Sequence, residues 1–395
     1  MFDHANPPSD FIENPWPHYD RLLAETPVLP QPDGSVLISR HADLNAIYRD
    51  TTTYISDKKQ AFAPKYGVGT PLYEHHTTSL VFNDPPLHTR VRRIITAALT
   101  PKALAELEPG LIATIDDLLD RMPAKPDLIT DYASAIPIQI IGNLLDVPVS
   151  ERAPLRDWSL AILGALEPTL TAAQLARGHQ AVAEFKSYLQ DLIARRRAAP
   201  GNPDTDVLTR LIQGDDHGQL TEIELIHNCI FILNAGHETT TNLIGSGLAL
   251  LHDHPAQKAA LEQSPDLITS TVEEVLRYRS PNQFGNRETT TDVTLGGVAI
   301  PAGTNLHLCI GAANRDPEDF ENPTVFDITR APNRHLAFAA GPHVCVGLTL
   351  ARMEGRIAID RFLRRFSKFE IGSERVRGGR IRFRGYEALP VTLSP

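Results

Sequence analysis

The stretch that decides the fold of this chain is FAAGPHVCVG, which runs from Phe338 to Gly347 near the C-terminus. It contains one cysteine, Cys345, and its glycines Gly341 and Gly347 allow the backbone to pass close to a flat bound group. Beyond the cysteine, apolar residues recur every three or four positions as far as Phe366, which predicts a helix whose N-terminal dipole favours a thiolate. A buried, inert cysteine at a junction between loop and helix is the alternative.

The stretch resembles the haem-binding loop of the cytochrome P-450 family, whose pattern is Phe-Gly-x-Gly-x-(His/Arg)-x-Cys-x-Gly. Ala339 replaces the first glycine of that pattern, and we expect this extra methyl group to tighten the loop without moving the cysteine. The resemblance, and not the spacing alone, implies that Cys345 is the thiolate ligand of the iron in haem b. It also implies that Phe338, His343 and Gly347 help to bind the haem.

The composition of the 395 residues indicates a reduced, cytoplasmic protein. The resemblance implies a single cytochrome P-450 domain over residues 1–395, with a β-rich N-terminal lobe and a larger helical lobe. The chain is 42% hydrophobic, which is enough for a large core. Its three cysteines, Cys229, Cys309 and Cys345, lack the number and spacing of a disulfide framework or a zinc site. The net charge of −10 argues against a nucleic-acid partner, and the polar N-terminus shows no membrane anchor.

A long helix is predicted from about Glu222 to His252, and it is apolar on nearly every side, as a buried helix should be. Its middle nevertheless contains the polar segment AGHET, residues 235–239. A buried carboxylate is costly unless it has a partner or a function, and a threonine inside a helix can bond to a carbonyl one turn earlier and open a kink. The segment resembles the family's oxygen-activation motif, which implies that Glu238 and Thr239 deliver protons. A buried capping network is the alternative.

Basic residues elsewhere are implied to bind the haem propionates, together with His343. His88 and Arg92 are four residues apart, and therefore lie on one face of a helix that begins after an Asp-Pro-Pro sequence. Such a pair alone would more often be a solvated basic face, but the match includes the preceding residues. Arg287 corresponds to the arginine of a strand that passes beside the haem in the resembled family.

The resemblance also places a substrate pocket along the long helix and the segment before Arg287. Its expected lining residues are Phe231, Ile232, Ala235, Asn282 and Gln283. The two amides predict a substrate with at least one hydrogen-bonding group, because a buried amide without a partner costs about 1–3 kcal/mol.

Glu274 and Arg277 are three residues apart, which alone would indicate an ordinary surface ion pair. Their place between the AGHET segment and the cysteine follows the family's order. The loop at 326–330 resembles the one whose basic residue completes a buried Glu-Arg cluster in the family. We therefore expect Glu274 and Arg277 to be structural.

The resemblance implies a mainly α fold with small β-sheets, the cytochrome P-450 fold, with haem between a long distal helix and the proximal helix that follows the cysteine loop. Near the N-terminus the pattern predicts a helix at 18–25, two strands around a turn at 32–34, and an irregular loop at 51–80. Further along it predicts a helix at 181–197 and a hairpin at 293–303.

The activity implied by the resemblance is that of a haem-thiolate monooxygenase, which inserts one oxygen atom from dioxygen into a C–H bond by hydroxylation or oxidative O-demethylation. We expect a small oxygenated aromatic or terpenoid as substrate. The sequence has no flavin, nicotinamide or iron–sulfur fingerprint, so electrons are expected from NAD(P)H through a ferredoxin reductase and a ferredoxin. Arg90, Arg93 and Arg352 are candidates for a basic docking face. The alternatives are a peroxide-driven peroxygenase and a non-catalytic haem-based sensor.

Overall fold

The computed structural model describes residues 2–203, 206–214 and 218–394. The chain divides into two compact units, each assembled from separate stretches of sequence. The first unit comprises Met1–Ile55, Ile115–Ala133 and Thr239–Pro395, and the second comprises Ser56–Thr114 and Ser134–Glu238. Two helices contribute residues to both units, α6 (Pro101–Asp120) and α11 (Glu222–Asp253).

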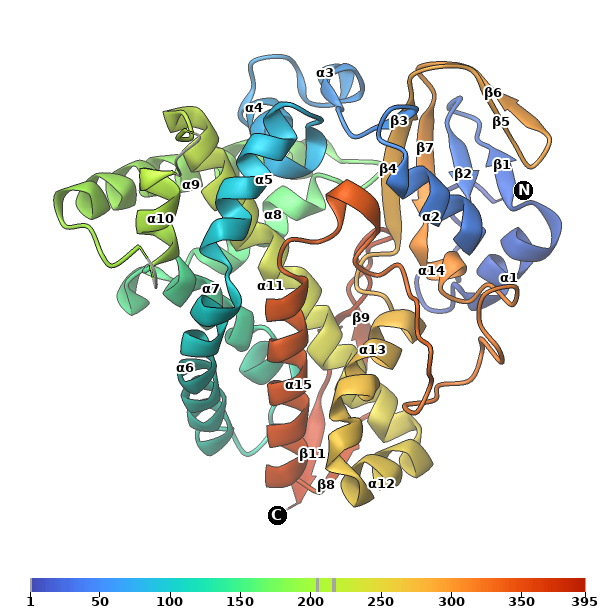
Figure 1. Cartoon of the computed structure of the whole chain (residues 1–395). Helices are drawn as coiled ribbons and strands as arrows, with labels where there is room; N and C mark the ends of the chain where they lie inside the picture. The colour runs from blue at the N-terminus through green and yellow to red at the C-terminus, as the bar shows by residue number, and fades with distance from the viewer. Residues whose placement is uncertain (1, 204–205, 215–217, 395) are drawn as a thin grey trace. The chain divides into compact units, whose positions relative to one another are not determined.

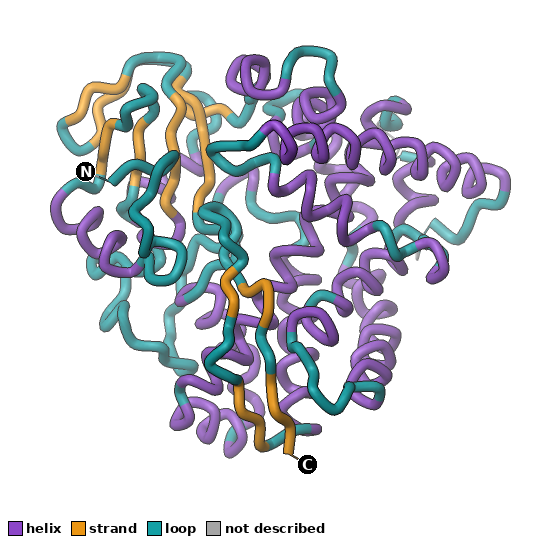
Figure 2. Tube along the Cα trace, turned by 180° about the vertical axis from the view of Figure 1, so that it is seen from behind, coloured by secondary structure: helices purple, strands orange, loops and turns teal. Residues whose placement is uncertain are grey.

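A five-stranded sheet with strand order β1-β2-β7-β4-β3 lies in the first unit (Figure 1). β2 and β7 are parallel, and the other neighbouring strands are antiparallel. The remaining named strands form two-stranded pairs, β5-β6, β8-β11 and β9-β10 (Figure 2). The bounds are β1 Val28–Pro30, β2 Val36–Ile38, β3 Tyr54–Ile55, β4 Phe284–Thr289, β5 Val293–Leu295, β6 Val298–Ile300, β7 Asn305–Cys309, β8 Lys368–Ile371, β9 Val376–Arg377, β10 Tyr386–Ala388 and β11 Val391–Ser394.

Local sequence explains two tight connections of this unit, and both confirm predictions. Gly34 has a φ of +84° in the turn between β1 and β2. Gly296 and Gly297 have φ values of +52° and +79°, the left-handed conformation that a two-residue loop requires between β5 and β6. The sheet and the helix beside it share one apolar cluster, which includes Val36, Ile38, Leu44, Tyr48, Leu306 and Leu308.

The helices of the first unit include the proximal helix α15, which follows the cysteine loop and packs against α13. Close packing of α15 against the second half of α11 requires small residues, because a Cβ on Gly355 would lie 2.9 Å from Leu243. The bounds are α1 Trp16–Glu25, α2 His41–Arg49, the single-turn η2 Ile129–Ala133, α12 Pro255–Gln263, η4 Pro265–Leu267, α13 Ile268–Tyr278, α14 Ile310–Ala313, η5 Gly341–His343 and α15 Leu348–Arg365.

The second unit is built mainly from helices, with α8 and α4 both packed on the long α9. Its helices are α3 Lys59–Tyr66, α4 Pro71–Thr78, η1 Leu80–Phe82, α5 Leu87–Ala98, α7 Ala135–Leu144, η3 Val149–Glu151, α8 Leu155–Gly164, α9 Ala172–Ala198 and α10 Val207–Gln213.

Two predictions about elements in and next to this unit were wrong in part. The stretch at 51–80 is not one irregular loop, because it contains β3 and the eight-residue helices α3 and α4. Pro64 inside α3 and the shortness of both helices conceal any apolar repeat. The helix predicted at 181–197 begins earlier, at Ala172, where Thr171 and Gln174 form a capping box. That Thr-x-x-Gln spacing was the signal in the sequence.

The long helix α11 is observed from Glu222 to Asp253, which confirms the prediction to within one residue. It is continuous through the AGHET segment. Among the described residues, no helix is long and apolar enough to span a membrane.

Candidate active site

The cysteine loop is held in shape by its own backbone. The N–H of Cys345 donates to the carbonyl of Phe338 at 3.0 Å, and the N–H of Val344 donates to the carbonyl of Gly341 at 3.0 Å. Helix α15 then begins at Leu348, with Gly347 as its N-cap residue. Cys345 therefore lies three residues before a helix N-terminus, as predicted, where the helix dipole favours a negatively charged sulfur.

The two glycines of the loop are needed for different structural reasons. Gly341 has a φ of +68°, and a Cβ there would clash with the carbonyl oxygen of Tyr48. Ala339 also has a positive φ, +58°, although it carries a Cβ, so the loop demands a glycine-like conformation where this chain has alanine. Gly347 has a φ of −91°, and no described protein atom outside its immediate neighbours lies within 4 Å of a Cβ built on it. A flat group lying against the loop would account for that glycine, so the loop fits haem.

Phe338 is fixed from one side by an ion-pair network. The Arg352 guanidinium lies 4.8 Å from the centre of its ring and binds the Glu273 carboxylate with two hydrogen bonds of 2.7 and 2.8 Å. His335 reaches the same carboxylate at 3.2 Å. Burial alone would raise the pKa of Glu273, but the hydrogen bonds from His335 and Arg352 outweigh it and lower the pKa to about 2. The predicted docking residue Arg352 thus has its charge balanced by Glu273.

Arg287 comes from strand β4 and is brought to the cysteine loop by a shared neighbour, Tyr48. The Arg287 guanidinium lies 5.0 Å from the centre of the Tyr48 ring and donates to the carbonyl of Asn286 at 2.7 Å. The backbone of Tyr48 meets the loop at Gly341. Burial raises the pKa of Tyr48 to about 12, so its phenol stays neutral beside the arginine. Tyr48 carried no signal in the sequence, since only the fold places helix α2 there.

In the second unit, His88 and Arg92 lie one turn apart on α5, as predicted. His88 is buried and Arg92 is half-buried. The helix begins directly after Pro85 and Pro86, and the preceding Asp84 accepts hydrogen bonds from the N–H groups of Ser56 and Asp57. The start of α5 is therefore anchored to the segment before α3. Arg90, a predicted docking residue on the same helix, is paired with Glu224.

Helix α11 is buried at every position from Glu224 to Leu251 except four, which are half-buried. The four are Phe231, Ala235, Gly236 and Thr239. Residues four apart lie on one face of a helix, so these positions form a single accessible stripe. The stripe includes Ala235, Gly236 and Thr239 of the AGHET segment. Two of its residues, Phe231 and Ala235, are among those predicted to line the pocket.

His237 and Glu238, the other two residues of the AGHET segment, are buried beside this stripe, and Gly236 lies at its edge. Gly236 permits close packing of α7, because a Cβ there would clash with Ile141. His237 Nε2 lies 3.2 Å from the Ser134 hydroxyl, also on the second unit. Glu238 is 8% exposed and directly precedes Thr239. A carboxylate next to a threonine at the edge of an accessible stripe is an arrangement that can hold and pass on a proton.

The remaining residues predicted for the pocket lie in different settings. Ile232 is buried on α11, and Asn282 is half-buried, with an Oδ1 that has no hydrogen-bond partner among the described residues. The amide of Gln283 is fully used inside the first unit, since it accepts from the Tyr19 hydroxyl at 2.7 Å and donates to the Ser280 carbonyl at 2.5 Å. These bonds favour a structural role for Gln283.

One residue was missed by the sequence analysis. Asn234 on α11 is 2% exposed, and within the described chain neither atom of its carboxamide has a hydrogen-bond partner. An asparagine inside the apolar run CIFIL-N-AG was a visible signal, because such a group is costly to bury unpaired.

Glu274 and Arg277 form a buried cluster, as expected. Arg277 binds Glu274 with two hydrogen bonds of 2.8 and 2.7 Å, and both side chains are 0% exposed. Arg330 also reaches Glu274, at 3.2 Å, which confirms that the loop at 326–330 completes the cluster. The remaining donors of Arg277 bind backbone carbonyls of Asn314, Pro323 and Val325.

Comparisons with known proteins agree with this geometry. The sequence profile described as cytochrome P-450 matches residues 164–376. The biotin biosynthesis cytochrome P-450 of Bacillus subtilis is 35% identical over 394 residues, covering 98% of each chain. The vitamin D(3) 25-hydroxylase of Pseudonocardia autotrophica is 36% identical, covering 98% of this chain and 95% of its own. The crystal structure of P450BioI in complex with an acyl carrier protein ligated to hexadec-9Z-enoic acid has a TM-score of 0.91 at 34% identity, covering 98% of this chain and 100% of that one.

Proposed function

Because the chain belongs to the cytochrome P-450 family and is therefore an oxidoreductase that binds haem b through a cysteine thiolate, we propose that Cys345 is that ligand. His88, Arg92, Arg287 and His343 would hold the propionates, and Phe338 and Gly347 would contact the macrocycle. The two units would together make one cytochrome P-450 domain, since the relatives match 98% of the chain. The reaction we propose is hydroxylation of a C–H bond, and oxidative O-demethylation is the alternative.

The observation that carries this proposal is the accessible stripe on α11. Haem b with a thiolate ligand supplies the activation of dioxygen when bound. The chain contributes positioned groups: the Thr239 hydroxyl lies on the stripe and can orient water and donate a hydrogen bond, while the adjacent Glu238 can hold a proton. Burial of the rest of the helix limits water to this stripe. A sensor or a peroxygenase would not require this pair of groups.

We propose that the substrate is largely apolar and carries an oxygen function, in keeping with an oxygenated aromatic or a terpenoid. Phe231 and Ala235 on the stripe would contact its apolar part. Asn234 and Asn282 each have an amide atom without a partner within the described residues, and a substrate carbonyl or hydroxyl would satisfy such a group. Gln283 is not part of this proposal.

Electrons are proposed to come from NAD(P)H through a ferredoxin reductase and a ferredoxin. The three predicted docking arginines are Arg90, Arg93 and Arg352, and the charges of Arg90 and Arg352 are balanced by Glu224 and Glu273. Screening at ordinary ionic strength acts over about 8–10 Å, and we expect reduction to slow as salt rises.

The function is tested with the haem-loaded protein, a surrogate ferredoxin and its reductase. A small library of matched pairs, each an alkane or arene and its oxygenated analogue, is screened by the substrate-induced shift of the Soret band. Compounds that shift it are then assayed for product with NADPH or with hydrogen peroxide alone. Product that depends on NADPH and dioxygen supports the monooxygenase, and product formed equally well with peroxide alone would favour the peroxygenase.

The substrate class is tested separately with Asn234→Leu, a change of similar volume. We expect oxygenated ligands to bind about tenfold more weakly and their hydrocarbon analogues to be unaffected, because one hydrogen bond is removed. The matched control is Ile232→Leu, a change on the same helix that removes no hydrogen-bonding group. Equal weakening of both ligand types would refute the role of Asn234 while leaving the monooxygenase assignment intact.

A further inference from the structure

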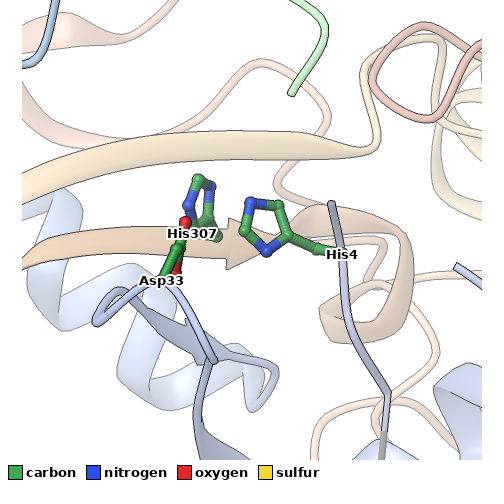
Figure 3. Close-up of side chains that lie close together, drawn as sticks. All are labelled: His4, Asp33 and His307. Carbon is green, nitrogen blue, oxygen red and sulfur yellow. The ribbon is translucent and has the colours of Figure 1, made fainter. Parts of the chain in front are cut away.

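Three residues that are far apart in the sequence meet at the surface of the first unit. His4 comes from the segment before α1, Asp33 from the turn between β1 and β2, and His307 from strand β7 (Figure 3). One ligand atom from each residue lies within 4.8 Å of the others. Figure 3 shows the two imidazole rings facing each other and the Asp33 carboxylate beside His307. This cluster takes no part in the function proposed above.

His4 is held by a neighbour that fixes its orientation. Its side chain is buried, and Gln31 Oε1 accepts the His4 backbone N–H at 3.0 Å and lies 3.2 Å from His4 Nδ1. Gln31 is itself buried and donates to the carbonyls of Leu29 and Phe2. Because Gln31 Oε1 can only accept, His4 bonds to it from a protonated Nδ1, and Nε2 then keeps its lone pair. A hydrogen bond on the second ring nitrogen is the usual support of a metal-ligating histidine.

Asp33 is oriented in a comparable way. One carboxylate oxygen, Oδ1, accepts from the backbone N–H of Ser35 at 3.0 Å and from its hydroxyl at 2.6 Å. The second oxygen, Oδ2, remains to face a cation.

We propose that His4, Asp33 and His307 form a site for Zn²⁺, with a fourth position open to water. Two imidazoles and one carboxylate are a donor set that suits Zn²⁺ and does not suit Mg²⁺ or Ca²⁺. Zinc bonds of about 2.0–2.1 Å require ligand atoms about 3.3 Å apart, so side-chain movements on the order of 1 Å would close the site. The His4 and His307 ring centres are already 3.7 Å apart.

Such a site would tie the N-terminal segment to the five-stranded sheet. His307 pairs with Asn286 in the register of β7 and β4, and Asp33 closes the β1-β2 turn, so one ion would connect three segments of the same unit. The competing explanation is a stacked histidine pair held by Gln31 without any metal. The two explanations differ in whether zinc binds at one equivalent and whether all three side chains are needed.

The test is isothermal titration of Zn²⁺ into untagged, haem-loaded full-length protein treated with a chelator. We expect one equivalent to bind with a micromolar or lower dissociation constant and to raise the melting temperature. His307→Ala and Asp33→Asn should each weaken binding about 100-fold or more, and Gln31→Leu about 10-fold to 100-fold. The Soret spectrum of each variant confirms that it is folded.

The matched control is His18→Ala, which removes a histidine from the same part of the chain that pairs instead with Asp10 at 3.0 Å. It should bind zinc like the parent protein. The proposal is overturned if the parent protein binds no zinc at 100 µM, or if His307→Ala and His18→Ala bind it with the same affinity.

Discussion

Two polar groups buried in helices of this protein differ in their hydrogen bonding. The Glu274 carboxylate on α13 accepts hydrogen bonds from Arg277, Arg330, Asn333 and the backbone N–H of Asp327, so it has no capacity left for a ligand. The Asn234 carboxamide on α11 is equally buried and has no partner among the described residues. A saturated buried group holds a fold together, while an unsatisfied one lowers stability and is retained where a ligand can complete it. The contrast distinguishes a polar group that is saturated by the fold from one for which we propose a ligand.

The largest effect should come from breaking the saturated cluster. Arg277→Leu leaves the Glu274 carboxylate buried without its main partner, which costs about 3–5 kcal/mol. We expect little folded, haem-loaded protein, measured as the Soret absorbance per unit of protein. The control Arg364→Leu removes an exposed arginine that pairs with Asp360 and should change stability by less than about 1 kcal/mol. Normal yield of Arg277→Leu would mean that the cluster is dispensable.

The next effect concerns the stripe on α11. Thr239→Ala should leave haem incorporation and substrate binding intact but lower the product formed per NADPH about tenfold or more, with hydrogen peroxide released instead, because it removes the hydroxyl that we propose places the proton. Glu238→Gln should slow NADPH consumption itself, since it interrupts proton supply. The measurement is the ratio of product, peroxide and NADPH for each variant. Unchanged coupling in Thr239→Ala would show that this threonine only shapes the helix.

A third buried polar group, the carboxyl group of Glu354, tests the contrast through pH. Glu354 on α15 is 1% exposed, its Oε2 has no hydrogen-bond partner in the described part of the chain, and burial raises its pKa to about 8. The folded state therefore keeps a proton that the unfolded chain releases above its ordinary pKa of about 4.3. The contribution of Glu354 to the free energy of unfolding is greatest below that pH, and it falls by up to about 1.4 kcal/mol per pH unit as the pH rises toward 8.

Glu354→Gln should remove this dependence. Denaturant unfolding of both proteins between pH 5 and pH 8 gives the difference in slope, and the variant should gain stability over the parent as the pH rises. Parallel curves would indicate that Glu354 is charged in the folded state and has a partner.

The unsatisfied group on α11 predicts a smaller effect of opposite sign to that of Arg277→Leu. Asn234→Leu should raise the free energy of unfolding by about 1–2 kcal/mol, because an unpaired buried amide is replaced by an apolar side chain of similar volume. Chemical denaturation of the ligand-free protein measures this. A loss of stability would show that the amide is already satisfied in the folded protein.

The smallest effect is expected in the cysteine loop. Ala339 has a φ of +58°, a conformation that costs a non-glycine residue roughly 1–2 kcal/mol, partly offset by the greater freedom of glycine in the unfolded chain. Ala339→Gly should therefore stabilise the protein by about 0.5–1 kcal/mol without changing the Soret band of the bound haem. A destabilised variant would mean that the Ala339 methyl contributes packing that outweighs the strain.

Sequence alone determined the features that depend on neighbours along the chain. The apolar run of α11 located that helix to within one residue, the two glycines at 296 and 297 located the hairpin, and the apolar repeat after Cys345 indicated helix α15. These are local, because periodicity, turn conformation and helix capping act over a few residues. The Glu274 and Arg277 cluster was predicted as well, but only through the resemblance.

Only the tertiary structure decided features that depend on residues distant in the sequence. It showed that Gln283 bonds to Tyr19 and Ser280, that Tyr48 joins Arg287 to the cysteine loop, and that one stripe of α11 stays accessible. It also brought His4 and His307 together across about three hundred residues. Which polar groups are satisfied is set by partners that folding selects from the whole chain, so no local pattern can show whether a buried amide is structural or is left for a ligand.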